Sequence, residues 1–357
     1  MRQPLTIIEV LSRALEKRAS DVIIMGGEYV AYKVYGSWQR EIPWGPLEDP
    51  QAENLIREMV NTDMQKFLDK EEGSARKDLD FSFSLPSGER FRVNVYRIQG
   101  RMAAVLRPIP QEPPPLESLG LPLSPIEAAL TRKRGLILVT GATGSGKSTT
   151  LAAMVEYLNQ REEIHIVTIE DPIEFFFQSK RAIISQREVG SDVESFAQAL
   201  RSALRQAPNV IMLGEMRDLE TIQAAITAAE TGHLVMATLH TRSAPEAITR
   251  IIDAFPEGYR EMVRLQLASS LSLVISQVLL PRVDGQGRVL AFDILVNTPA
   301  IASLIQQNKI NNIEQTMYTG KEYGMITLAQ CLRDLMQRGL ISQKAAATVL
   351  DEQKLKI

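Results

Sequence analysis

The spacing of apolar residues changes along the chain, and its first pattern predicts a small mixed domain. Ile7, Ile8, Leu11 and Leu15 recur at the spacing of one helix face, so a helix is predicted within the first 19 residues. Short alternating segments follow, from DVIIMGG to ERFRVNVYRI, with turn signals such as GG and PSGE between them. Together they predict an antiparallel sheet in an α+β domain over residues 1–107.

A proline-rich segment follows this region. Residues 108–125 hold seven prolines, and proline neither continues a helix nor donates to the ladder of a central strand. Such a run is semi-rigid. We therefore predict a stiff linker over residues 108–125.

From Gly135 onward, apolar strand-like cores alternate with helical segments. GLILVT, IHIVTI, NVIML and HLVMATL have predominantly apolar cores, which is typical of parallel strands covered on both faces. The pattern predicts an α/β core with a parallel sheet over residues 126–296. Beyond it, segments such as TLAQCLRDLMQRG predict a helical region over residues 297–357.

Composition and charge exclude several classes of protein. The formal net charge of -3, from 40 basic and 43 acidic side chains, offers no global attraction for nucleic acid or an anionic membrane. No stretch reaches the roughly 18 apolar residues of a spanning helix, and the first residues lack a signal peptide's apolar centre. A cytoplasmic protein is expected. The single cysteine, Cys331, lies in an apolar helical context and is predicted to be a core thiol.

One segment matches a phosphate-binding loop in full. Residues 141–148, GATGSGKS, fit the pattern G-x-x-x-x-G-K-[ST] between a predicted strand and a predicted helix. The glycines let backbone amides face phosphates, Lys147 supplies a charge to the β- and γ-phosphates, and the Ser148 hydroxyl is a ligand for Mg²⁺. The cofactors predicted are ATP and Mg²⁺. The predicted nucleotide contacts are Gly141, Ala142, Thr143, Gly144, Ser145, Gly146, Lys147, Ser148 and Thr149.

Hydrolysis also needs carboxylates at the ends of neighbouring strands. Glu170 follows the strand IHIVTI, and Glu215 follows the strand VIML in a segment that looks like a Walker B motif. We predict Glu170 as the base that orients the attacking water, and Glu215 in the Mg²⁺ shell, directly or through water. The spacing leaves the reverse order open, and either acid could instead cap the following helix.

Three histidines occur in the chain. His233 and His240 bracket one predicted strand after the Walker B segment, and both are candidates for sensing the γ-phosphate or relaying its loss. His165, at the start of its strand, is predicted to be structural.

The motifs resemble those of the secretion ATPases of type IV pili and type II secretion. GATGSGKST resembles their Walker A motif, TIEDPIEF their Asp box, LGEMRD their Walker B motif and AAETGHLVMATLHT their His box. Segments such as QREVGSD and ALRSALRQAP are most similar to the PilT/PilU-like retraction ATPases of type IV pili. One segment departs from that group: residues 300–307 read AIASLIQQ where AIRNLIRE is usual.

The resemblance implies a fold and an assembly. It implies a RecA-like P-loop core, an amino-terminal PAS-like domain, and a homohexamer with ATP bound between the two kinds of domain. Arginines of the amino-terminal domain reach the γ-phosphate in that family, and the matching positions are Arg92 and Arg107, with Arg101 as a weaker candidate.

The function implied is a motor that hydrolyses Mg-ATP and powers pilus retraction and twitching motility. Its expected partners are an inner-membrane platform protein of the pilus and a paralogous retraction ATPase, with the motor peripheral at the pilus base. Two alternatives stay open: an accessory PilU-like ATPase or non-hydrolysing regulatory subunit, and a nucleic-acid translocase of RecA-like fold. The acidic balance and the lack of a basic, aromatic-interleaved loop disfavour the translocase.

Overall fold

A computed structural model of the chain describes residues 5–34, 36–60, 78–110, 112–285 and 287–352. The chain divides into two compact units, Met1–Gln111 and Glu112–Ile357. Each unit is described by itself.

The first unit is an antiparallel sheet with helices on one face. The sheet has the order β3-β2-β1-β6-β5-β4, and every neighbouring pair is antiparallel, as predicted. Phe91, Val93 and Val95 alternate with polar residues and pack with both helices into one core. The elements are α1 (Ile7–Glu16), β1 (Asp21–Met25), β2 (Ala31–Val34), β3 (Ser37–Arg40), η1 (Ile42–Trp44), α2 (Asp49–Arg57), β4 (Leu79–Ser84), β5 (Arg90–Ile98) and β6 (Arg101–Ile109).

The proline-rich segment contains more regular structure than its composition suggests. Strand β6 includes Pro108, which pairs with Phe91 of β5, whereas the pairing of β6 with β1 ends at Leu106. Strand β1 no longer pairs with β6 at Pro108, so the absence of an N–H there costs no hydrogen bond to β1. Leu116, in η2 (Leu116–Leu119), is buried in the core of the second unit. The assignment of the whole segment to a linker stays a prediction.

The second unit is built on a seven-stranded sheet of order β13-β12-β7-β11-β10-β8-β9. All neighbours are parallel except β12 and β13, so the predicted parallel sheet is confirmed with one antiparallel edge strand. The strands are β7 (Gly135–Thr140), β8 (His165–Glu170), β9 (Ile183–Glu188), β10 (Val210–Leu213), β11 (Leu234–Leu239), β12 (Leu271–Pro281) and β13 (Arg288–Val296).

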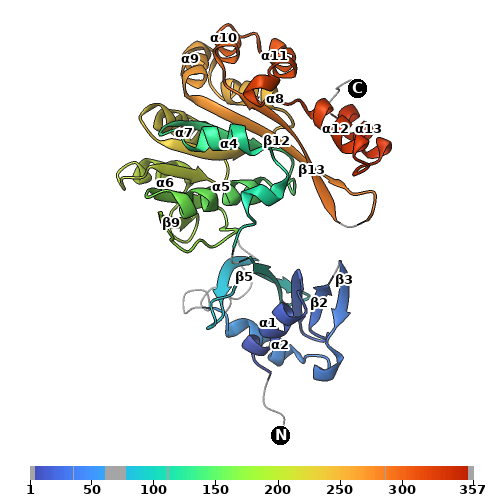
Figure 1. Cartoon of the computed structure of the whole chain (residues 1–357). Coiled ribbons are helices and arrows are strands. Elements are labelled where there is room, and N and C mark those ends of the chain that lie inside the picture. Colours follow the sequence, from blue (N-terminus) through green and yellow to red (C-terminus); the bar gives the residue numbers. More distant parts are fainter. Residues whose placement is uncertain (1–4, 35, 61–77, 111, 286, 353–357) are drawn as a thin grey trace. The chain divides into compact units, whose positions relative to one another are not determined.

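Helices cover both faces of this sheet (Figure 1). One face packs against α6 (Phe196–Ala203), α7 (Leu219–Glu230), α8 (Ala244–Asp253), α9 (Arg260–Ser270), α10 (Pro299–Gln306) and α11 (Ile313–Thr319). The other packs against α4 (Leu123–Leu130), α5 (Lys147–Arg161), α12 (Leu328–Gln337) and α13 (Gln343–Glu352). Short connections form η3 (Glu257–Tyr259), η4 (Ile310–Asn312) and η5 (Lys321–Tyr323).

Buried positions agree with the predictions for the carboxyl-terminal part. Cys331 is a free thiol, 4% exposed, on the side of α12 that faces the core. Helix α10 contains all of the AIASLIQQ segment except its last residue, and its Ile301 and Ile305 are fully buried. The changed charges of this segment therefore leave its apolar packing intact. Within the described part of the chain, no helix combines the length and apolarity that crossing a membrane requires.

Candidate active site

The phosphate-binding loop joins the end of β7 to the start of α5. Gly144 and Gly146 have φ of 77° and 91°, values that favour glycine, and α5 begins at Lys147. Gly141 is constrained in addition by space, because a Cβ there would lie 2.3 Å from the carbonyl oxygen of Gln277. Backbone amides and a helix amino terminus thus converge on one point, which is the geometry that binds phosphate.

Lys147 lies inside this loop. Its side chain is 8% exposed, and Nζ donates hydrogen bonds to the carbonyl oxygens of Gly141 and Ala142, both at 3.0 Å. Burial lowers the pKa of Lys147, and the nearby charge of Glu215 opposes that shift. The following hydroxyls, on the exposed Ser148 and the half-buried Thr149, lie in the first turn of α5.

A residue far away in the sequence braces the loop, and sequence reasoning missed it. Gln277 of β12 is 4% exposed; its Nε2 donates to the Ser145 carbonyl at 2.8 Å, and its Oε1 accepts from the Thr150 hydroxyl at 3.1 Å. A buried glutamine in an apolar strand is the one signal the sequence offered. These two bonds fix the loop on both sides of Lys147.

Glu215 is the more accessible of the two predicted acids. It follows β10, and its carboxylate accepts from Arg217 Nε at 2.7 Å and lies 3.2 Å from His240 Nε2. His240 follows β11, so two neighbouring strand ends bring these groups together. The structure thereby groups Glu215, His240 and Lys147, which the sequence analysis had selected separately.

Glu170, at the end of β8, is 5% exposed. Burial raises its pKa to about 7, although three hydrogen bonds oppose the shift. Those bonds come from the Thr168 hydroxyl at 2.7 Å and from the Glu174 N–H and Gln186 Nε2, both at 3.3 Å. A buried carboxyl whose pKa lies near neutral pH suits a general base.

The remaining histidines lie elsewhere. His233 precedes β11, and its carbonyl accepts from the N–H of Gly135 at the first residue of β7. Because β7 and β11 are parallel, His233 lies at the opposite sheet edge from the loop that follows β7. Within one subunit the structure does not bring His233 to this site. His165 binds the Gln206 carbonyl and the Ser185 hydroxyl, consistent with a structural role.

The candidate arginines belong to the first unit, and two of them are cross-strand neighbours. Arg92 of β5 pairs directly with Arg107 of β6, and both are exposed. Arg107 Nη2 lies 2.7 Å from Asp21, while Arg101 Nε lies 3.3 Å from Asp49. Arg92 and Arg107 therefore present adjacent positive charges on the face of the sheet away from its helices.

The donor set fits Mg-ATP. Positive-φ glycines and the start of α5 suit a polyphosphate, and the Ser148 hydroxyl with a carboxylate nearby suits Mg²⁺, which keeps several waters in its shell. Among the described residues, no group of three or more histidine, cysteine, aspartate or glutamate side chains is arranged to hold a metal ion, so this site offers no all-protein metal cage.

Comparisons with known proteins agree with this site. PilT of Pseudomonas aeruginosa, a type IV pilus retraction ATPase, is 46% identical over 344 residues, which are 95% of this chain and 96% of PilT. The type IV pilus ATPase PilU of the same bacterium is 38% identical over 343 residues, 96% of this chain and 88% of PilU.

The solved structures include a similar fold, and a family profile covers nearly the whole chain. A crystal structure of the pilus retraction motor PilT with bound ADP matches with a TM-score of 0.89 at 43% identity, over 97% of both chains. The profile of the Type II/IV secretion system protein family matches residues 4–354. With its complete phosphate-binding loop and strand-end acids, the chain is an ATPase that belongs to the Type II/IV secretion system protein family.

Proposed function

We propose that this ATPase is the motor that retracts type IV pili. The observation that carries the proposal is the full-length match to the retraction ATPase PilT, at 46% identity, in a chain whose phosphate-binding loop is complete. ATP hydrolysis supplies the free energy, and rotation of the amino-terminal domains against the cores delivers it as movement.

In the proposed reaction, Glu170 accepts the proton of the water whose oxygen bonds to the γ-phosphorus, while the bond from the γ-phosphorus to the β–γ bridging oxygen breaks and ADP leaves. Glu215 with Ser148 would hold Mg²⁺. The pKa of Glu170, raised to about 7 by burial, supports the first role, because a base with this pKa accepts a proton readily at neutral pH. The lower burial of Glu215 and its place near Lys147 support its role as a ligand of Mg²⁺, directly or through water. Mg²⁺ supplies charge neutralisation on the phosphate oxygens.

His240 senses the γ-phosphate in this proposal. Its contact with Glu215, at 3.2 Å, supports this role, because a displacement of either side chain changes the position of the other. His233 remains a candidate for relaying the loss of phosphate to a neighbouring subunit. Because it lies far from the phosphate-binding loop of its own subunit, it would have to act on the site of that neighbour.

Arg92 and Arg107 stabilise the charge that develops on the γ-phosphate. Their direct cross-strand pairing supports this role, because two adjacent guanidinium groups suit a phosphate's several oxygens. Hydrolysis would then depend on the position of the amino-terminal domain.

We further propose that six copies form a ring on the cytoplasmic side at the pilus base. The ring would act on an inner-membrane platform protein of the pilus, with a paralogous retraction ATPase as a second partner. The similarity to both PilT and PilU supports this set of partners.

Complementation tests the proposal directly. A strain lacking the gene and complemented with Lys147→Ala is expected to be hyperpiliated and unable to twitch, whereas the wild-type gene restores motility. Normal piliation and motility in the Lys147→Ala strain would remove the pilus assignment.

One alternative within the family is an accessory PilU-like ATPase or a non-hydrolysing regulator, favoured by the 38% identity to PilU. Purified protein that binds ATP yet releases no phosphate would support the regulator.

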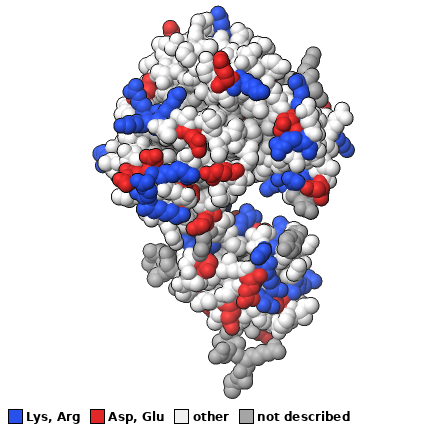
Figure 2. All heavy atoms as spheres, in the orientation of Figure 1, with Lys and Arg blue, Asp and Glu red and all other residues white. Residues whose placement is uncertain are grey.

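The nucleic-acid translocase has less support. Figure 2 shows Lys and Arg interspersed with Asp and Glu over the visible face, without a continuous basic stripe. Tight, salt-sensitive DNA binding would reverse that judgement.

A further inference from the structure

A row of buried polar side chains crosses the sheet one residue before the phosphate-binding loop. Thr140 of β7, Ser276 of β12 and Asp293 of β13 are adjacent in register and are 0%, 2% and 4% exposed. The hydroxyls of Thr140 and Ser276 lie 2.7 Å apart, and Ser276 is the direct cross-strand partner of Asp293, whose ionised form it favours. Buried polar groups cost free energy, so such a row within an apolar sheet calls for a functional explanation.

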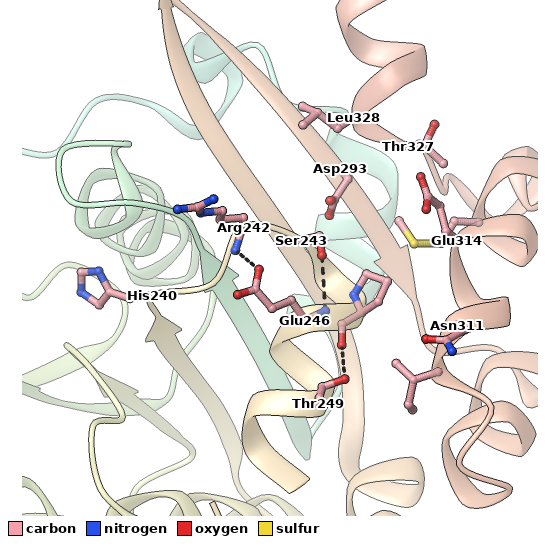
Figure 3. Close-up of a pocket in the computed structure, with 13 residues that line it drawn as sticks. His240, Arg242, Ser243, Glu246, Thr249, Asp293, Asn311, Glu314, Thr327 and Leu328 are labelled. Atoms are coloured by element: carbon pink, nitrogen blue, oxygen red, sulfur yellow. Dashed lines mark hydrogen bonds between the residues drawn. The ribbon is translucent and has the colours of Figure 1, made fainter. Parts of the chain in front are cut away.

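Asp293 also contacts the segment that follows His240. The N–H of Ala244, the first residue of α8 and the neighbour of the capping residue Ser243, favours the ionised form of Asp293. Figure 3 shows the Asp293 side chain directed toward Ser243 at the start of that helix. Only two residues separate His240 from Ser243, so an anchor at the start of α8 limits the positions His240 can take.

The surroundings of Asp293 do not explain it as an ordinary ion pair. Its Oδ1 has no hydrogen-bond partner, and no cation pairs with it in the described structure. It borders a cavity of about 820 Å³ whose lining includes His240, Arg242, Glu246 and Glu314. Glu314 of α11 is itself a carboxylate and disfavours the ionised form of Asp293. Retaining an acid here is unfavourable unless its contacts with Ser276 and with the start of α8 matter.

We propose that Asp293 is a positioning residue of the ATPase site. Through Ser276 and Thr140 it holds the strand end from which the phosphate-binding loop starts, and through its place against the start of α8 it holds His240 against Glu215. The inference deepens the proposed function and rests on the proposed role of His240.

The expected kinetic effect separates catalysis from binding. Asp293→Ala lowers kcat about tenfold to a hundredfold, because small misplacements of reacting groups have effects of that size. The KM for ATP and the affinity for a fluorescent ATP analogue change less than about threefold, since Lys147 and the loop amides remain. Asp293→Asn keeps the shape and one acceptor, so it restores part of the lost kcat.

A double-mutant cycle with His240→Ala provides the decisive test. If Asp293 acts through His240, Asp293→Asn lowers kcat in the wild-type background and has little further effect when His240 is already alanine. The same cycle with Ser276→Ala tests the other arm without touching the acid. Thermal melting of each variant identifies those whose folded population has changed. If Asp293→Ala does not fold, the kinetics of the nearly isosteric Asp293→Asn are used instead.

The outcomes distinguish the two proposals. An unchanged kcat in His240→Ala overturns the role of His240, and this inference with it. A lowered kcat in His240→Ala, combined with an effect of Asp293→Asn that is equally large in both backgrounds, overturns the positioning role of Asp293 alone. A kcat for Asp293→Asn equal to that of the wild type also overturns it.

Discussion

Replacing Glu170 by glutamine is expected to make the protein more stable and catalytically inactive at once. The carboxyl is 5% exposed, and its pKa rises from the ordinary value of 4.5 to about 7 on folding. A carboxyl whose pKa is raised on folding lowers the stability of the folded state when it is ionised, and has no such effect when it is protonated. Its unfavourable contribution therefore grows as the pH increases from the unfolded pKa through the folded pKa.

The size of the effect follows from that shift. The charge of Glu170 disfavours the folded state by about 1 kcal/mol at pH 5 and about 3 kcal/mol at pH 8. Glutamine carries no charge. With its oxygen in place of Oε1 it still accepts from the Thr168 hydroxyl and Gln186 Nε2, while its NH2 group faces the Glu174 N–H in place of Oε2. The stability of Glu170→Gln relative to the wild type should thus rise by about 2 kcal/mol between these pH values.

Thermal melting of the nucleotide-free protein measures this difference. For a domain of this size, about 2 kcal/mol corresponds to roughly 4–8 °C in Tm. Other titrating groups, Asp293 among them, are present in both proteins and cancel in the comparison. A Tm difference that stays constant from pH 5 to pH 8 would refute the argument that Glu170 is buried with a raised pKa.

Turnover of the same variant tests the catalytic role. Removing a general base lowers kcat by about a hundredfold or more, while ATP is still bound. Glu215→Gln is the matched control, since it is expected to alter the Mg²⁺ dependence of turnover. Robust hydrolysis by Glu170→Gln together with loss of hydrolysis in Glu215→Gln would transfer the role of base to Glu215.

Three further outcomes are expected. The kcat of the wild type should fall as the pH drops through about 7, because protonated Glu170 cannot accept a proton; a profile flat from pH 6 to 8 contradicts this. Gly141→Ala should weaken binding of a fluorescent ATP analogue at least about tenfold, because its Cβ meets the Gln277 carbonyl. Gly190→Ala, also at a positive φ but with open space around it, should not. Gln277→Ala should cost about 2–4 kcal/mol of stability, measured as a Tm shift, since two buried hydrogen bonds are lost; an unchanged Tm argues against the brace.

Local patterns were enough to predict the central chemistry. The phosphate-binding loop is contiguous in sequence, and Glu170 and Glu215 each follow an apolar run that ends as a strand. Because parallel strands present their carboxyl ends at one sheet edge, these residues could be assigned to one site before any contact was known. The same patterns identified α1 as a helix and the alternating strands of the first unit. The predicted face of α1 was partly wrong, because Ile8 is exposed and Val10 and Ala14 are buried in its place.

Other elements escaped local reasoning. Strands β9, β12 and β13 were not predicted, since a short apolar run such as that of β12 does not distinguish a strand from a buried helix. The antiparallel pairing of β13 with β12 likewise depends on a hairpin rather than on a crossover helix, which periodicity does not reveal.

What the sequence by itself determined was which side chains bind phosphate and activate water, because each is encoded within a few residues of a strand end. Only the tertiary structure decided how those groups are held. Gln277 reaches the loop from more than 120 residues away, Asp293 meets both Ser276 and the start of α8, and His233 lies at the edge opposite to His240. Such contacts arise from the order and direction of strands across the whole sheet, and no local spacing specifies them.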